Sequence, residues 1–260
     1  MFSKAAGFAV ICGAFIVGCG TDQAPDSADD TREIVDNLVE AGYPTSEISV
    51  VDHVVYVGND AAVSLQASRE MLEGGSSSEE QYRTTNLVSS AVDTICINGT
   101  KLTGVFSTAL DEAIANYNAV GLSFTMRRIS NGSSSGCDAV ITGRVSGPTG
   151  GSSGFPSGGL PFNKFQIGSG LKSFALSTIT HVITHELGHT IGFRHSDFFD
   201  RSISCGGSAS NEGDGGIGAI LIPGTPSGAT VGGSIMNSCF RTVENGEFTN
   251  SDLTALNALY

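Results

Sequence analysis

The stretch that decides the fold is His185-Glu186-Leu187-Gly188-His189-Thr190-Ile191-Gly192-Phe193-Arg194-His195. It contains the spacing H-E-x-x-H followed directly by x-x-G-x-x-H. On a helix, His185 and His189 lie one turn apart on the same face, so both imidazoles can reach one metal ion. Gly192 can adopt a positive φ, which ends the helix and lets His195 return as a third ligand.

Three protein ligands leave the fourth position of a tetrahedral zinc open for water, as in catalytic zinc sites. We therefore predict one catalytic Zn²⁺ held by His185, His189 and His195. Glu186 is placed to take a proton from that water as the general base. An isolated H-E-x-x-H can arise on a helix by chance, but a glycine and a third histidine at fixed offsets make chance a poor explanation.

These residues resemble the metzincin metallopeptidases, and the resemblance implies a turn containing methionine beneath the metal. Ser234-Ile235-Met236-Asn237 fits that turn, with Met236 packed beneath the ligands. The stretches HELGHTIGFRHSD, IPGTP at 222–226 and SIMN look most like the dual-action HEIGH metallopeptidase family, with Leu187 in place of its isoleucine. The resemblance extends, more weakly, from about Thr31 to Tyr260. One departure is Ser238, where astacins and serralysins have a tyrosine that approaches the zinc.

The resemblance implies an α+β fold: a metzincin-type zincin domain with a mixed twisted sheet, an active-site helix and a Met-turn. It implies an endopeptidase that hydrolyses protein or peptide substrates with a water held on the zinc. The alternative is a surface binding module that keeps the fold without turnover. A degenerate peptidase would be expected to lose a ligand or the acid, yet Glu186 and the three histidines are all present.

The first residues have the pattern of an export signal. One lysine, Lys4, precedes the apolar run 5–17, and the segment ends in Ile16-Val17-Gly18-Cys19. This ending resembles a bacterial lipobox in which Cys19 becomes the lipidated first residue, and a plain cleaved signal peptide is the alternative. We expect a lipoprotein signal at 1–18 and an acidic tether at 19–30. Gly20, not aspartate, follows Cys19, which by resemblance to enteric lipoproteins favours the outer membrane or cell surface, with a soluble form after processing.

Four cysteines remain for the exported part of the chain, and they permit three pairings. We prefer Cys96–Cys137 and Cys205–Cys239, because each pair closes a loop within one half of the domain. Free buried thiols or a second zinc site are the alternatives. The chain has no Cys-x-x-Cys, which argues against a second zinc.

Residues 31–83 are expected to form a small α/β pro-module and linker ahead of a catalytic domain at 84–260. A helix begins near Thr31, a valine-rich strand covers 48–57, a helix covers 63–72, and 74–80 is a linker. The position before the catalytic domain suggests a propeptide cut near Arg83. The alternative is an accessory module that stays attached.

A propeptide could hold the zinc site latent. Residues 20–95 contain no cysteine to block the metal, but Tyr56-Val57-Gly58-Asn59-Asp60 ends in a carboxylate, which is a competent zinc ligand. The segment loosely resembles the astacin propeptide motif in which Asp follows Gly, although Asn59 intervenes. Asp60 is therefore the candidate latency ligand, and the alternative is that it merely ends a strand in a turn.

Within the catalytic domain, hydrophobic periodicity predicts a short series of helices and strands. We expect strands at 88–97, 122–129 and 138–144 and helices at 105–119 and 252–259. Another helix carries the zinc motif, with Leu176, Ile179 and Ile183 on its buried face. The resemblance further implies an edge strand within 147–167 that borders the cleft and can pair with an extended peptide. Between His195 and Met236 the chain is Gly-rich and expected to be irregular.

The chain has a net charge of −13 and no basic cluster, which excludes nucleic acid as a main partner and leaves the lipid as the only membrane contact. We assume a monomer. Calcium is undecided, because Asp197, Asp200, Glu212 and Asp214 are available but lack calcium-loop spacing. Asp197 could orient His195, brace the turn, or lie solvated in a loop. His181, one turn before His185, could support the ligands or be a packed polar residue.

Overall fold

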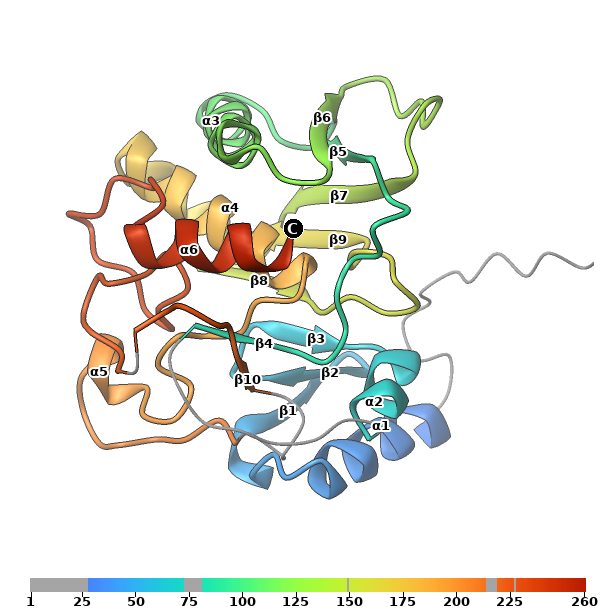
Figure 1. The fold of residues 1–260 in the computed structure, drawn as a ribbon, viewed down its shortest axis with the longest axis vertical. Coiled ribbons are helices and arrows are strands. Elements are labelled where there is room, and N and C mark those ends of the chain that lie inside the picture. Colours follow the sequence, from blue (N-terminus) through green and yellow to red (C-terminus); the bar gives the residue numbers. More distant parts are fainter. Residues whose placement is uncertain (1–27, 73–80, 149, 214–218, 227) are drawn as a thin grey trace, which may run out of the picture.

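The computed structural model describes residues 28–72, 81–148, 150–213, 219–226 and 228–260, which form a mixed α/β fold (Figure 1). One eight-stranded sheet has the order β1-β2-β3-β8-β9-β7-β5-β6, and β10 pairs separately with β4. The strands are β1 (Ile48–Val51), β2 (Val54–Val57), β3 (Ala61–Val63), β4 (Tyr82–Arg83), β5 (Thr94–Asn98), β6 (Thr125–Ile129), β7 (Ala139–Val145), β8 (Gly151–Gly154), β9 (Lys164–Ile167) and β10 (Ile220–Leu221). The helices are α1 (Ala28–Glu40), α2 (Leu65–Met71), α3 (Val105–Val120), α4 (Leu176–Thr190), α5 (Ser202–Cys205) and α6 (Asn250–Leu259).

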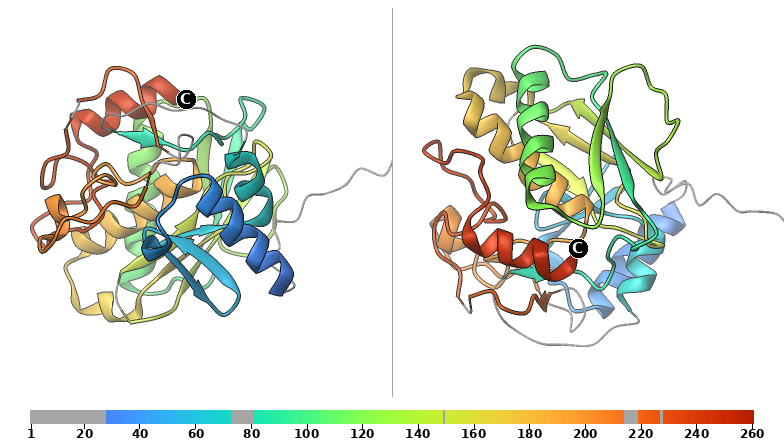
Figure 2. Two further views of the ribbon diagram at one scale, coloured as in Figure 1. Left: turned by 90° about the horizontal axis from the view of Figure 1, so that it is seen from below. Right: turned by 45° about the horizontal axis from the view of Figure 1, so that its top comes forward.

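The mixed sheet and its helices form the larger hydrophobic core. Strands β5, β6, β7 and β9 pair in parallel, and β8 runs antiparallel to β9. Helices α3 and α4 pack against each other and against this sheet (Figures 1 and 2). The α4 side chains from Thr178 to Thr190 are all buried, on every side of the helix. Packing therefore stabilises a helix whose Thr, Val and Ile content is poor for an isolated one.

The N-terminal segment, residues 28–72, is continuous with this sheet and is not a separate body. Its last strand, β3, pairs in parallel with β8 at Ala61↔Ser153 and Ala62↔Gly154. Helices α1 and α2 cover β1–β3 with their own apolar cluster, into which Phe155 of the following domain also packs. The expected module is thus present as a helical and β-hairpin unit, but it is joined edge to edge with the strand that borders the metal centre (Figure 2).

The prediction of one strand over 48–57 was wrong. The segment is a hairpin of β1 and β2, with Ile48 opposite Val57. Asp52 and His53 form the turn with φ of 49° and 66°. A two-residue hairpin loop of type I′ needs positive φ at both central positions, and Asp-His is an uncommon pair for such a loop. The valine-rich pattern therefore concealed the turn.

The expected boundary at 83/84 also needs correction. Tyr82 is buried, its carbonyl accepts from the Arg194 amide at 2.8 Å, and Arg83 pairs with Ile220. The Gln81 amide donates to Ser234 and Asp252 at 2.7 and 2.9 Å. Residues from Gln81 onward therefore belong to the larger body. The predicted linker, 74–80, lies outside the described residues.

Other elements follow the predictions with shifted ends. Strand β5 begins at Thr94, not at residue 88, and 88–93 form an irregular approach to it. Helices α2, α3 and α6 lie where the periodicity placed them. The strand expected within 147–167 is β8, which lies next to the metal centre, but it is not an edge strand, because β3 pairs with it on one side and β9 on the other.

Both preferred disulfides are present. Cys96 and Cys137 join β5 to the segment before β7, and Cys205 and Cys239 join α5 to the segment after Met236. The export signal, Cys19 and the tether to residue 27 lie outside the described residues. None of the helices within the described ranges is long and apolar enough to cross a bilayer.

Asp252 is a buried carboxylate that joins three distant segments, and we expect Asp252→Ala to lower the melting temperature by roughly 5–10 °C. Its oxygens accept from Gln81, Ser234, the Ile235 amide and the Thr249 amide at 2.6–3.0 Å. Each buried donor left unpaired costs about 1–3 kcal/mol, and 1 kcal/mol shifts a domain of this size by about 2–4 °C. Thermal unfolding measures the change. Asp111→Ala, at a largely exposed ion pair with Arg128, should cost less than about 1 kcal/mol and so lower the melting temperature by less than about 4 °C. Equal losses of melting temperature in the two variants would contradict the role of Asp252.

Candidate metal centre

The three histidines of the zinc motif converge on one point. Helix α4 presents His185 and His189 one turn apart, and Gly192 then takes φ of 113°. A Cβ at Gly192 would lie 2.8 Å from the Asn86 carbonyl oxygen, so only glycine fits the turn that returns His195. The Nε2 atoms lie 3.0 Å apart for His185–His189 and 3.3 Å for each of the other pairs.

The opposite ring nitrogens fix the orientation of all three imidazoles. The Nδ1 atoms of His185 and His189 lie 2.8 Å from the carbonyl oxygens of Ile235 and Phe193. His195 Nδ1 lies 2.6 Å from the Glu212 carboxylate. Because these partners only accept, Nδ1 carries a proton in each ring, and Nε2, which faces the centre, is the atom available to a metal. Burial would lower the pKa of His195, but Asp60 and Glu212 raise it well above its usual value, so a metal would replace the proton on Nε2 of this ring.

This donor set fits a metal ion. Three lone pairs that face one another about 3 Å apart repel unless a cation lies between them. Tetrahedral ligands at about 2.0–2.1 Å from zinc are separated by roughly 3.3–3.4 Å, close to the distances found here. Among the described residues, one group of at least three metal-ligating side chains comes together, and it consists of Asp60, His185, His189 and His195.

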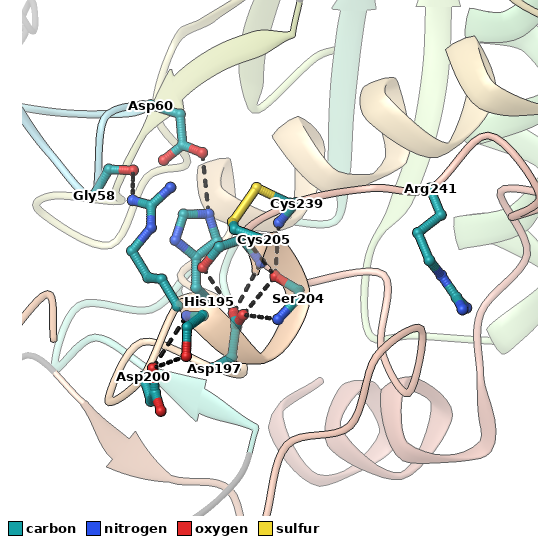
Figure 3. Close-up of a disulfide and its surroundings, with 12 residues drawn as sticks. Gly58, Asp60, His195, Asp197, Asp200, Ser204, Cys205, Cys239 and Arg241 are labelled. Atoms are coloured by element: carbon teal, nitrogen blue, oxygen red, sulfur yellow. Dashed lines mark hydrogen bonds and ion pairs between the residues drawn. A yellow bond between two sulfur atoms is a disulfide. The ribbon is translucent and has the colours of Figure 1, made fainter. Parts of the chain in front are cut away.

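Asp60, the candidate latency ligand, lies at the same point. Its carboxylate is 3.0 Å from His195 Nε2 (Figure 3). It is 3.9 Å from the Nε2 atoms of His185 and His189. Burial would raise the pKa of Asp60, but the histidines hold the pKa well below its usual value, so the group is ionised. Its carbonyl accepts from the Ser153 amide at 2.9 Å, which fixes the backbone at the start of β3. Asp60 also ends the turn between β2 and β3, as the alternative expects, but its side chain is only 16% exposed and faces the histidines.

Glu186 lies beside the cluster, fully buried. Ser153 on β8 donates its hydroxyl to Glu186 Oε2 at 2.7 Å. A Cβ at Gly151 would lie 2.2 Å from Glu186 Oε1, so the glycine makes room for the carboxylate. Burial raises the pKa of Glu186 well above its usual value, and the nearby Asp60 charge raises it further. A raised pKa suits a carboxylate that must both accept and return a proton near neutral pH. Ser153 and Gly151 lie in a Gly- and Ser-rich stretch with no motif that marks either residue.

Met236 packs against the helix at Gly188. A Cβ at Gly188 would lie 2.5 Å from the Met236 sulfur, so the methionine approaches the helix where it lacks a side chain. The Met236 carbonyl accepts from the Ser196 amide at 2.8 Å, which ties this segment to the residue after His195. The expected location of Met236 beside the ligands therefore has a clear packing basis.

Asp197 braces loops and does not orient a ligand. It is fully buried, which excludes the solvated alternative. One oxygen accepts from Ser238, at 2.8 Å from the amide and 2.7 Å from the hydroxyl, and the other from the Ser204 hydroxyl at 2.5 Å (Figure 3). The orienting contact to His195 comes instead from Glu212, seventeen residues along the chain. No local sequence pattern joins those two residues.

A cavity of about 180 Å³ opens beside the metal centre, between α4 and the segment after Met236. His181, Val182, Ser238, Phe240 and Asp60 are among its lining residues. His181 is buried, 3.5 Å from a Glu244 oxygen, and burial lowers the pKa of His181 to about 4. It is a neutral packed residue that lines the cavity, as one of the two alternatives anticipated.

The acidic residues considered for calcium have other partners. Asp197 and Asp200 accept from serine hydroxyls, and Glu212 from His195 and arginines. Asp214 lies outside the described residues.

Comparison with known proteins gives a family and a structural likeness. A family model described as the dual-action HEIGH metallo-peptidase matches residues 55–260. Two solved structures, both of myroilysin, are each 14% identical to the chain. They cover 68% and 72% of it, and 95% and 92% of their own chains, with TM-scores of 0.40 and 0.39. No curated protein matches.

Proposed function

The chain belongs to the dual-action HEIGH metallopeptidase family, and on that premise we propose that it is a zinc-dependent endopeptidase of the metzincin type. The observation that carries the proposal is the convergence of three Nε2 lone pairs beside a buried glutamate. The segment Ser234–Asn237, which packs Met236 against Gly188, would serve as the Met-turn.

In the proposed reaction, His185, His189 and His195 hold the ion. When bound, zinc would lower the pKa of a water and polarise the scissile carbonyl. Glu186 accepts the proton from the attacking water and delivers it to the leaving amine. Ser153 holds the Glu186 carboxylate at one oxygen, which leaves the other free for the proton. Position 238 is a serine, which donates to Asp197, so no tyrosine at this position takes part in the proposed reaction.

We also propose that residues 28–72 keep the full chain latent. Two contacts support this. The Asp60 carboxylate lies among the ligand nitrogens, where a water would have to bind. Strand β3 pairs with the side of β8 that faces away from β9, and an extended substrate could pair there if β3 were absent. Metal and substrate positions are thus both covered by one short stretch, Asp60–Val63.

The test is turnover by purified protein with defined zinc content. Removal of residues before Gln81 should produce peptide cleavage that depends on added zinc and stops with a chelator. The cleavage products on a peptide library, read by mass spectrometry, would give the substrate preference. Zinc binding without cleavage of any peptide or unfolded protein would instead support a binding module that keeps the fold.

For localisation we propose an exported lipoprotein anchored through Cys19, and we expect Cys19→Ala to move the protein from membranes to the soluble fraction. The support is the lipobox-like Ile16-Val17-Gly18-Cys19 at the end of the apolar segment. Incorporation of labelled fatty acid measures the modification. Cys12→Ala is the matched control, because it changes a cysteine within the same apolar run and should retain the label. An unmodified N-terminus downstream of Cys19 in wild type would contradict the anchor.

A further inference from the structure

Glu212 lies at the junction of the third histidine, two arginines and the N-terminal segment. We propose that its carboxylate positions His195 and also docks the segment that carries Asp60, so that metal binding and latency are coupled through one side chain. The inference rests on the proposed zinc site and latency, and it assigns a role to a residue that no sequence motif marks.

The positioning role follows from the contacts of Glu212 with the ligand loop. Its Oε1 lies 2.6 Å from His195 Nδ1, and the residue is only 2% exposed. The Arg194 guanidinium lies 3.3 Å away and that of Arg201 3.2 Å away, which compensates the buried charge. A carboxylate on Nδ1 fixes the ring and makes Nε2 a stronger donor to a metal.

The docking role follows from contacts on the other side of the same carboxylate. Gly58 adopts φ of 60°, and a Cβ there would lie 2.9–3.0 Å from the carboxylate atoms of Glu212. Arg201 Nη1 donates to the Gly58 carbonyl at 2.5 Å while it pairs with Glu212. Gly58 is two residues before Asp60. The backbone that delivers Asp60 therefore rests directly on the group that orients His195.

Further contacts place the same loop beneath the N-terminal segment. The Arg194 guanidinium lies 5.0 Å from the Tyr43 ring, and Ser210 donates to Glu47 at 2.5 Å. Arg194, one residue before the third ligand, thus contacts the segment and Glu212 together. Because binding couplings are reciprocal, a segment that docks better when His195 is ordered must also favour the ordered ligand.

The first test compares two buried carboxylates of the same loop. Glu212→Gln in the full chain should weaken zinc affinity by about 10- to 100-fold, as for other groups that orient ligands. Asp197→Asn is the matched control, because Asp197 is equally buried but contacts serines, and it should stay within about threefold of wild type. Zinc affinity is measured by competition with a chromogenic chelator, after zinc-free unfolding shows that both variants fold. Equal zinc affinities for Glu212→Gln and wild type would overturn the positioning role.

The second test displaces the segment without touching a ligand. Gly58→Ala adds a methyl group against Glu212, which should displace the segment and loosen the His195 ring that Glu212 holds. Zinc should therefore pass from the full chain to excess chelator at least about tenfold faster than in wild type, a change of about 1.4 kcal/mol in the barrier to release. Gly132→Ala is the control for backbone strain, because Gly132 has φ of 73° with open space around it. A Gly58→Ala release rate within twofold of the Gly132→Ala rate would overturn the docking role.

These readouts do not depend on peptidase activity. Zinc effects as expected, with no hydrolysis in any activated form, would reject the proposed endopeptidase while the coupling stands. Zinc-dependent hydrolysis with unchanged zinc affinity and release in both variants would reject the coupling alone.

Discussion

Glu186→Gln is expected to keep zinc and to lose about two to four orders of magnitude in peptide hydrolysis. The amide retains the shape of the side chain but cannot accept a proton from water, which is the step that general-base catalysis accelerates. Glu186 is not one of the converging ligands, and glutamine keeps the shape of its side chain, so the three histidines should still hold the metal. The measurement is kcat/KM on a quenched peptide, made on a form that begins at Gln81, with zinc content determined for the same sample.

Glu112→Gln is the control for this change. Glu112 on α3 accepts from Thr180 of α4, the helix that carries Glu186, at 2.6 Å. Among the described residues Glu112 has no contact with the histidines, so hydrolysis should stay within about threefold of wild type. Ser153→Ala should fall between the two, because it removes one hydrogen bond to Glu186 and keeps the carboxylate. Equal activity in wild type and Glu186→Gln at matched zinc would reject Glu186 as the base.

The sequence predicts the centre of this site well because its geometry is local. Two histidines at a four-residue spacing and a glycine three residues further on bring three imidazoles together within one short stretch of chain. The helix itself was predictable from Leu176, Ile179 and Ile183. Disulfide pairs were also predictable, because each closes a loop within one part of the domain.

What could not be predicted depends on contacts between distant segments. Glu212 reaches His195 across a Gly-rich loop, and Ser153 reaches Glu186 from a strand 33 residues earlier. The union of β3 with β8 joins parts of the chain some ninety residues apart. Asp60 was selected from a local pattern alone, since only the fold brings its carboxylate to the histidines.

Asp60→Ala in the full chain is expected to raise hydrolysis of a short peptide by roughly 10- to 150-fold. This range corresponds to the about 1.5–3 kcal/mol of one charge-assisted contact. The substitution removes the carboxylate from the ligand nitrogens, but the Ser153 amide still donates to the backbone carbonyl at residue 60. Strand β3 should therefore stay on β8, so long substrates would gain less than short ones. Rates on a short and a long peptide, together with binding of a small hydroxamate, measure the two effects separately.

Asp36→Ala is the matched control, because it removes an exposed carboxylate from α1 of the same segment and should leave the chain latent. The reference for full activity is the form that begins at Gln81, since a start at residue 84 would remove the Gln81 contacts to Ser234 and Asp252. If Asp60→Ala bound the hydroxamate no better than wild type while the Gln81 form was active, Asp60 would not be the blocking ligand. Latency would then rest on β3 alone, because that strand would still cover the edge of β8.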